Sequence, residues 1–275
     1  MVDVISRYVK NELNFDMKYL TSLLLFIIIA SKVQAQDDYE IQVYNSPTTE
    51  KGITLFELHS NFTPSGSKQY SDNIFPSDKI FHETLEITHG FSDFFEVGFY
   101  FFNAVGSDGR TGYAGSHIRP RFSVPESLNL PVGLSLSFEM GYQRIGFFGN
   151  HWLFEIHPII DKEFGMFYIS VNPTFDWNID RHEFEFNPCM QASAKIFKKA
   201  DLGFEWYSGY GPVEHFLLWG EQHQVLFLAT NINFGNRWEF NAGIGRGLNQ
   251  SNDPWIIKCI VGKGIAGKKY KGKKE

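Results

Sequence analysis

Twelve runs of alternating apolar and polar residues, each about ten residues long, place the strongest constraint on the fold of this chain. Apolar side chains fall on every second residue of a run, and each run ends at Gly, Asn, Asp, Ser or Pro. This period is typical of β-strands with one apolar face, and no convincing helical period competes with it. The runs span residues 53–62, 82–90, 94–103, 112–122, 132–143, 152–161, 166–177, 183–196, 201–210, 223–234, 237–246 and 254–263.

The joints between the runs alternate between tight and mostly longer ones. Short turns on one side and longer loops on the other indicate a meander of antiparallel hairpins, and this asymmetry is typical of outer-membrane barrels. An even strand number would place both ends of the barrel on the periplasmic side. The tight joints are 90–93, 162–165, 197–200 and 235–236, and the longer ones are 63–81, 104–111, 144–151 and 211–222.

Large aromatic residues at the strand ends favour a membrane barrel over a soluble β-sandwich, which would also show alternation. Two aromatic belts around an aliphatic band are selected by the headgroup regions of a bilayer. An open sheet edge in lipid would leave backbone groups unpaired, so the sheet has to close. We therefore predict an all-β fold, an antiparallel up-and-down transmembrane β-barrel of about 12 strands. The predicted girdle comprises Tyr142, Trp152, Trp177 and Trp255 beside the longer loops, and Phe122, Phe197 and Trp238 beside the short turns.

Four prolines fall inside the predicted strands, where each removes a hydrogen-bond donor from the sheet. They are Pro120, Pro158, Pro173 and Pro188. We expect bulges or displaced strand boundaries at these positions.

The N-terminal residues indicate export. Lys18, an apolar run from Leu20 to Ala30 and the sequence Val33-Gln34-Ala35 match the three parts of a signal peptide, with cleavage after Ala35. The apolar run is too short for a membrane-spanning helix. The predicted organisation is an upstream extension that is not native (1–16), a signal peptide (17–35), a periplasmic N-terminal segment (36–51), the barrel (52–264) and a basic C-terminal tail (265–275).

Composition excludes several classes of function. The formal charge of -6 and the absence of a basic face argue against a nucleic-acid partner. Two cysteines, Cys189 and Cys259, are too few for a disulfide framework, and their predicted orientations are opposite. His215, Glu221 and His223 match no established metal spacing, and an apolar loop over the barrel mouth is the favoured interpretation of that stretch. We predict no metal site and no cofactor.

The stretches "KGITLFELHSNF" and "ETLEITHGFSDFFEVGFYF" carry a resemblance to a known family. They resemble the opening strands of the outer-membrane barrel family assigned as transporters of the MetA pathway of phenol degradation. The resemblance covers the first quarter of the chain and implies an outer-membrane channel for small organic compounds, without catalytic residues. The matching positions are Gly52, Phe56, Glu57, Glu86, His89, Gly90, Phe91, Ser92, Asp93, Glu96, Val97 and Gly98.

The polar face of each strand defines the predicted lumen. A cylinder of twelve tilted strands is roughly 24 Å wide, so inward side chains leave at most a narrow bore. The favoured interpretation is an ionic network that fills the lumen, in which Arg119, Arg121, Lys195 and Lys258 pair with the carboxylates. A charged constriction that prefers cations or neutral solutes is the functional interpretation, and the two can coexist. The predicted lumen residues are Glu57, His59, Glu86, Glu96, His117, Arg119, Arg121, Glu139, Glu155, His157, Glu185, Lys195, Glu205, Glu239 and Lys258.

These patterns predict a passive channel in the bacterial outer membrane for small neutral or cationic solutes. The expected partners are outer-membrane lipid, the barrel assembly machinery and a small solute that the sequence does not identify. A non-conducting structural barrel is the main alternative. A lipid hydrolase is less favoured, because its nucleophile and histidine usually face lipid at the outer rim, whereas His59, His117 and His157 are expected inside. We therefore predict that the chain is not an enzyme.

Overall fold

The computed structural model describes residues 39–70, 74–107 and 109–267. The predicted upstream extension and signal peptide, and residues 268–275 of the predicted basic tail, lie outside this part of the chain. The strands are β1 (Ile53–Ser65), β2 (Ile80–Ser92), β3 (Phe95–Gly106), β4 (Thr111–Ser123), β5 (Gly133–Gln143), β6 (Trp152–Phe164), β7 (Phe167–Asn172), β8 (Phe175–Asn178), β9 (Glu183–Phe186), β10 (Cys189–Phe197), β11 (Ala200–Gly209), β12 (His223–Gly235), β13 (Trp238–Gly247) and β14 (Trp255–Ala266).

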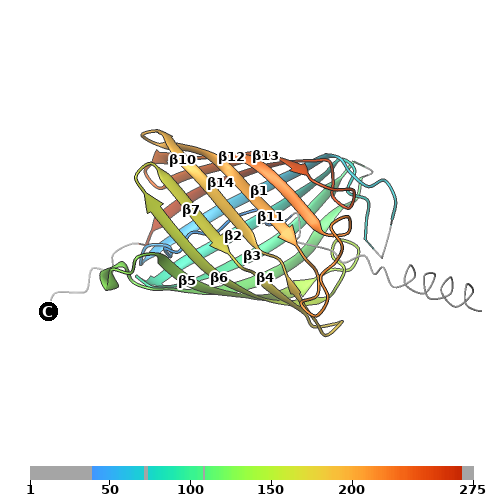
Figure 1. The fold of residues 1–275 in the computed structure, drawn as a ribbon, viewed down its shortest axis with the longest axis horizontal. Coiled ribbons are helices and arrows are strands. Elements are labelled where there is room, and N and C mark those ends of the chain that lie inside the picture. Colours follow the sequence, from blue (N-terminus) through green and yellow to red (C-terminus); the bar gives the residue numbers. More distant parts are fainter. Residues whose placement is uncertain (1–38, 71–73, 108, 268–275) are drawn as a thin grey trace, which may run out of the picture. The chain divides into compact units, whose positions relative to one another are not determined.

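The strands form one closed antiparallel barrel (Figure 1). Closure follows from the first strand, because β1 pairs with β2 on one side and with β14 on the other. β7 and β8 are two parts of one barrel strand, as are β9 and β10, so the fourteen segments make twelve barrel strands. The predicted fold class is confirmed, and each predicted run matches one barrel strand to within three residues at either end.

The four prolines interrupt the hydrogen-bond ladders without shifting them. Pro120 lies in β4 opposite Val97 and interrupts the pairing of β4 with β5. Pro173 and Pro188 occupy the breaks that separate β7 from β8 and β9 from β10. The registers on both sides of these breaks place Pro158 opposite Pro173, and Pro173 opposite Pro188. Three adjacent strands therefore lack N–H donors at one level. Of the two expected outcomes, bulges or displaced strand boundaries, the structure shows boundaries at Pro173 and Pro188.

The two ends of the barrel differ in their connections. At one end, the turn end, four connections have two residues each, at 93–94, 165–166, 198–199 and 236–237. Asn236 and Arg237 both have positive φ, at 51° and 60°, as in the hairpin turns that match strand twist. The exception is 124–132, which contains the 3₁₀ helix η1 (Glu126–Leu128). The opposite end, the loop end, carries the connections 66–79, 107–110, 144–151, 179–182, 210–222 and 248–254.

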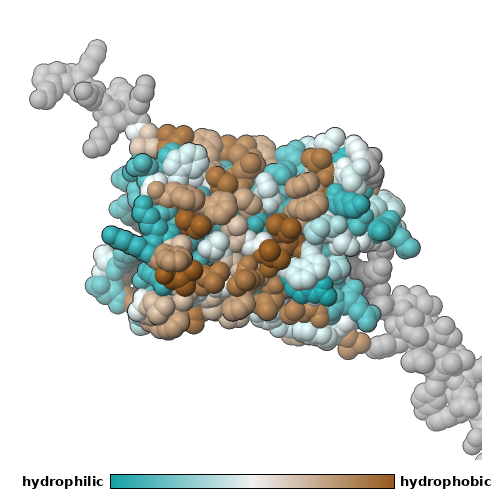
Figure 2. All heavy atoms as spheres, turned by 90° about the horizontal axis from the view of Figure 1, so that it is seen from above, coloured by the Kyte–Doolittle hydropathy of each residue, from teal (hydrophilic) through white to brown (hydrophobic). Residues whose placement is uncertain are grey.

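The outer wall is apolar and the inner wall is mostly polar. Along β3, Phe99 and Phe101 are exposed outward, whereas Glu96, Tyr100 and Phe102 are buried inside. Figure 2 shows hydrophobic residues over the middle of the outer wall and hydrophilic residues gathered toward its two ends. Such a wall buries its apolar surface only when another apolar medium surrounds it. Within the described residues, no helix is long and apolar enough to cross a membrane.

Candidate functional site: the barrel lumen

The structure places nearly all of the predicted lumen residues inside the barrel. Glu239 borders the interior cavities but is exposed to solvent near the turn end. Lys195 is also at the turn end, with 48% of its side chain exposed, and it pairs with Glu163. The other thirteen lie well inside: Glu57, His59, Glu86, Glu96, His117, Arg119, Arg121, Glu139, Glu155, His157, Glu185, Glu205 and Lys258.

Residues 39–50, here called the inner segment, run through the lumen from the loop end to the turn end. The Tyr39 ring stacks on Phe148 of the 144–151 loop, with centroids 4.8 Å apart. At the other end, the Thr49 N–H donates to Glu96 Oε2 close to the 93–94 turn. We expected a periplasmic segment at 36–51, and the structure places residues 39–50 inside the barrel instead. The physical reason is that inward-facing side chains of the wall form hydrogen bonds with the backbone of this segment and enclose its apolar side chains.

Hydrogen bonds to the barrel wall hold the middle of the inner segment. The Tyr44 N–H donates to Asn172 Oδ1 at 2.7 Å, and the Tyr44 carbonyl accepts from Ser170 Oγ at 2.7 Å. The Ser46 N–H and hydroxyl both donate to the Asp161 carboxylate, each at 2.8 Å. A lone extended segment in a lumen has no neighbouring strand, so these side chains supply the partners that a strand would give.

Two glycines make room for the inner segment. A Cβ atom on Gly133 would lie 2.1 Å from Ser46 Oγ, and one on Gly90 would lie 2.2 Å from the Thr49 carbonyl oxygen. At Gly90 the clash would be with the backbone of the segment, so a side chain there would displace it, whereas at Gly133 the side chains of Ser46 and Asp161 would have to shift. Gly90 is also one of the positions that carry the family resemblance.

The loop-end half of the lumen is closed by apolar packing around the inner segment. One cluster surrounds Tyr39, and a second surrounds Ile41 and Val43. The first contains Tyr39, Ile80, Tyr100, Phe102, Ala104, Ala114 and Phe148, and the second contains Ile41, Val43, Cys189, Tyr207, Val225, Phe227 and Ile256. The alternation of Tyr39, Ile41 and Val43 puts these side chains at every second residue, as in a strand.

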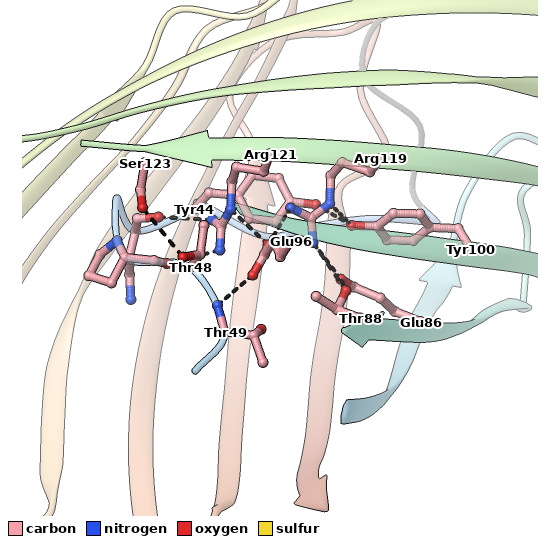
Figure 3. Close-up of polar contacts among 12 residues, drawn as sticks. Tyr44, Thr48, Thr49, Glu86, Thr88, Glu96, Tyr100, Arg119, Arg121 and Ser123 are labelled. Carbon is pink, nitrogen blue, oxygen red and sulfur yellow. Dashed lines mark hydrogen bonds and ion pairs between the residues drawn. The ribbon is translucent and has the colours of Figure 1, made fainter. Parts of the chain in front are cut away.

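Two arginines organise the side of the lumen that is formed by β2, β3 and β4 (Figure 3). Arg119 Nη2 donates to Glu86 Oε1 at 2.6 Å, and Arg119 Nη1 donates to Glu96 Oε1 at 3.1 Å. Its Nε donates to the Tyr100 hydroxyl, and its guanidinium lies 4.8 Å from the centre of the Tyr44 ring. These contacts give the buried Arg119 guanidinium two carboxylates, a hydroxyl and an aromatic ring as partners. A buried arginine is tolerated only when its charge is paired in this way.

Arg121 links this network to the inner segment. Its Nε lies 2.8 Å from Glu96 Oε1, while Nη1 and Nη2 donate to the carbonyl oxygens of Asn45 and Pro47, each at 2.9 Å. On the opposite wall, Lys258 forms a buried ion pair with Glu205 and donates to the Ile41 carbonyl at 3.1 Å. The inner segment is therefore part of the ionic network that fills the lumen.

Cavities remain beside the inner segment in the turn-end half. One of about 450 Å³ is bordered by Glu57, Glu86 and Arg119, and extends to Trp238. Another of about 400 Å³ is bordered by Glu205 and Lys258 and extends to Lys198 near the turns. In the loop-end half, a cavity of only about 80 Å³ is bordered by Tyr39, Glu40 and Phe148. Of these three cavities, the two in the turn-end half are the larger.

Several carboxylates in the loop-end half have no basic partner. Among the described residues, Glu40, Glu139, Glu155, Asp176 and Glu185 make no ion pair with a lysine or arginine. Glu40 lies on the inner segment and accepts a hydrogen bond from the Tyr44 hydroxyl. Glu139 and Glu155 contact His117 and His157, respectively, at 2.6 Å. The expected network of arginine and lysine pairs thus covers only part of the lumen.

The predicted girdle residues all lie at strand ends. Tyr142, Trp152, Trp177 and Trp255 are exposed near the loop end, and Phe122, Phe197 and Trp238 are exposed near the turn end. Their role at a membrane interface stays a prediction.

In the 210–222 loop and its border, Glu221 accepts a hydrogen bond from the Leu218 N–H, and no possible metal group of the described residues includes His215, Glu221 or His223.

Sequence reasoning missed the inner segment and the wall residues that hold it. Tyr39, Ile41 and Val43 alternate with polar residues, and this signal was available in residues 39–44. The sequence does not distinguish the wall residues Asp161, Ser170 and Asn172 from other inward-facing polar residues. Their role depends on a segment more than one hundred residues away.

Comparisons with known proteins identify the fold. No protein-family model matches the chain, and no curated protein matches it. A crystal structure of an outer-membrane channel from Pseudomonas putida F1 superposes with a TM-score of 0.59 at 12% identity, covering 82% of this chain and 100% of that chain. A KdgM porin structure superposes with a TM-score of 0.52 at 9% identity, covering 76% of this chain and 98% of that chain. The chain is thus similar in fold to outer-membrane channels.

Proposed function

We propose that this chain is a passive outer-membrane channel for small solutes and that the inner segment closes it. The observation that carries the proposal is the arrangement of the lumen. Polar cavities of about 450 and 400 Å³ lie beside the inner segment in the turn-end half, whereas apolar packing around Tyr39 and Ile41 closes the loop-end half. Displacement of the first residues of the inner segment would join these cavities to the loop end.

Two further observations support a membrane location for the channel. The outer wall is apolar over its middle (Figure 2), and the two structures with a similar fold are described as an outer-membrane channel and a porin. Export by a cleaved signal peptide would deliver the chain to the periplasm before insertion. The resemblance to the barrel family of the MetA phenol pathway adds small organic compounds as a candidate solute class.

The charge of the lumen favours neutral or cationic solutes. Among the described residues, Arg119, Arg121 and Lys258 are the buried arginine and lysine side chains of the interior, and each of them contacts a carboxylate. More buried carboxylates lack such a partner, most of them in the loop-end half and Glu57 in the turn-end half, so an anion would meet uncompensated negative charge.

Planar-bilayer conductance tests the proposal. The refolded full chain should show small or intermittent conductance, and a variant that lacks residues 39–49 should show a larger and continuous conductance, because the strands that form the wall begin only at Ile53. Reversal potentials in a KCl gradient should indicate cation preference in the deletion variant. A folded deletion variant without conductance and without solute flux would contradict the channel.

A non-conducting barrel is the second candidate, and the filled lumen favours it. The inner segment, the arginine network and the two apolar clusters together leave no wide bore. The same measurement separates the candidates. A structural barrel stays silent with the full chain at every voltage and releases no solute from liposomes, even though the deletion variant conducts.

A further inference from the structure

A row of four carboxylates crosses the inner wall in the loop-end half. Glu139 of β5 lies directly opposite Glu155 of β6, Glu155 lies opposite Asp176 of β8, and Asp176 lies opposite Glu185 of β9. Cross-strand partners on one face have Cβ atoms about 5 Å apart, and like charges at this spacing are destabilising. Four adjacent strands with an acidic residue at the same level therefore need compensation, either by protons on the carboxylates or by a bound cation.

The described lysines and arginines form no ion pair with the row. Arg119, Arg121 and Lys258 pair with Glu86, Glu96 and Glu205. Arg181 borders the small cavity at the row but is exposed and forms no ion pair with it among the described residues. Glu40 of the inner segment adds a further carboxylate to the same cavity.

Two histidines complete a set of metal ligands. His117 Nδ1 lies 2.6 Å from Glu139 Oε1, and the side chains are 3% and 2% exposed. The ligand atoms of His117, Glu139 and Glu155 all lie within 4.8 Å of one another. A second trio, Glu155, His157 and Asp176, meets the same condition and shares Glu155 with the first. Ligand atoms around a tetrahedral Zn²⁺ ion are roughly 3.3 Å apart, so small side-chain rotations bring either trio into range.

Unsatisfied polar atoms point to a missing ligand. His117 Nε2 and Asp176 Oδ1 are buried, and neither has a hydrogen-bond partner among the described residues. Both residues border the cavity of about 80 Å³, together with Glu139, Glu155 and His157. Buried polar atoms in native proteins are nearly always paired, so two orphaned atoms at one cavity indicate that something polar binds there.

We propose that this cavity binds a divalent metal ion, with His117, Glu139 and Glu155 as ligands. Imidazole nitrogen combined with carboxylate oxygen suits Zn²⁺ better than Mg²⁺ or Ca²⁺, which prefer oxygen ligands alone. The ion offsets two of the four negative charges of the carboxylate row, and it links β4, β5 and β6 in the half of the lumen where the inner segment begins. Binding of the ion does not depend on the proposed channel function.

Isothermal titration of the refolded full chain in detergent, after treatment with a chelator, tests the site with ZnCl₂ as the probe. We expect saturable binding of Zn²⁺ and weaker binding of Ca²⁺ and Mg²⁺. Glu155→Gln should weaken Zn²⁺ binding by about tenfold or more, because Glu155 belongs to both trios. Glu163→Gln is the matched control, since Glu163 is an exposed glutamate of the same strand, and it should bind Zn²⁺ like the unaltered chain.

X-ray absorption of the zinc-loaded full chain gives a second test that needs no variant. It should show nitrogen and oxygen ligands with a histidine contribution, although Cys189 borders the same cavity. A sulfur ligand, an absence of Zn²⁺ binding, or equal binding by folded Glu155→Gln would each overturn the proposal. If Glu155→Gln fails to fold, as judged by heat-dependent migration in gels, the absorption spectrum decides alone. None of these outcomes bears on whether the barrel conducts.

Discussion

The two halves of the lumen are filled by different kinds of side-chain contact. The network on β2, β3 and β4 pairs Arg119 and Arg121 with Glu86 and Glu96 and borders a cavity that extends to the turn end. The loop-end half packs aromatic and aliphatic side chains around the inner segment, and two of its carboxylates contact histidines in place of arginines or lysines. In the proposed channel, the loop-end half would be the main barrier to a solute, and the arginine network holds the wall and the end of the segment.

We expect the largest effect on the stability of the barrel from a substitution that breaks the arginine network. Arg119→Gln leaves Glu86 and Glu96 buried with fewer partners, which should lower the free energy of unfolding by about 3–5 kcal/mol. Unfolding in urea, followed by the change in gel migration of the barrel, measures this loss. Lys195→Gln is the control, because its solvent-exposed pair with Glu163 should contribute little to stability. Equal effects of the two substitutions would contradict the assigned role of the network.

Removal of the Tyr39 ring should weaken the packing of the inner segment in the loop-end half and leave the rest of the lumen unchanged. Tyr39→Ala removes the contacts with Phe102 and Phe148 and should weaken docking of the inner segment by about 2–4 kcal/mol. The barrel itself should keep its stability, because Tyr39 is not part of a strand. Conductance should increase, and proteases should cut the segment faster. Tyr70→Ala, at a tyrosine with 58% exposure, should change neither property.

A side chain added at Gly133, on the barrel wall, should displace the middle of the inner segment. Gly133→Val would crowd Ser46 and Asp161, and we expect a loss of about 1–3 kcal/mol together with release of the middle of the segment. Hydrogen exchange of the Tyr44 and Ser46 amides reports the release. At Gly220, by contrast, a Cβ would meet nothing within 4 Å, so Gly220→Val should leave this exchange unchanged.

The smallest expected effect comes from one hydroxyl. Ser46→Ala removes the hydrogen bond from Ser46 Oγ to Asp161 but keeps the one from the backbone, and Tyr168 still donates to the same carboxylate. Docking of the segment should weaken by about 1 kcal/mol, which is measurable as a several-fold increase in proteolysis between residues 39 and 50. An effect as large as that of Tyr39→Ala would show that polar anchors, and not apolar packing, close the lumen.

The sequence predicted the wall of this barrel much better than its contents. Alternation locates each barrel strand, because one face of every strand meets an apolar medium, and parity then assigns residues such as Glu96 and Arg119 to the interior. Parity says nothing about register, so the alignment of Glu139, Glu155, Asp176 and Glu185 could not be foreseen. The alignment of Pro158, Pro173 and Pro188 depends on register in the same way.

The inner segment could not be placed because its partners are distant in sequence. The hydrogen bonds between Tyr44 and Asn172 join residues 128 positions apart. A short alternating stretch before the first strand is compatible with a free segment, an additional strand or a lumen filler. Only the room left by Gly90 and Gly133, and the donors and acceptors opposite it, decide among these.

The course of the inner segment has a consequence for how the barrel is assembled. The segment descends from the loop end before β1 starts, and β1 then pairs with β14, the last strand of the described part of the chain. The seam that completes the cylinder therefore closes around a piece of its own chain. Either these twelve residues are already in place when the seam forms, or they must later be threaded through a finished ring of strands, which would be the slower of the two routes.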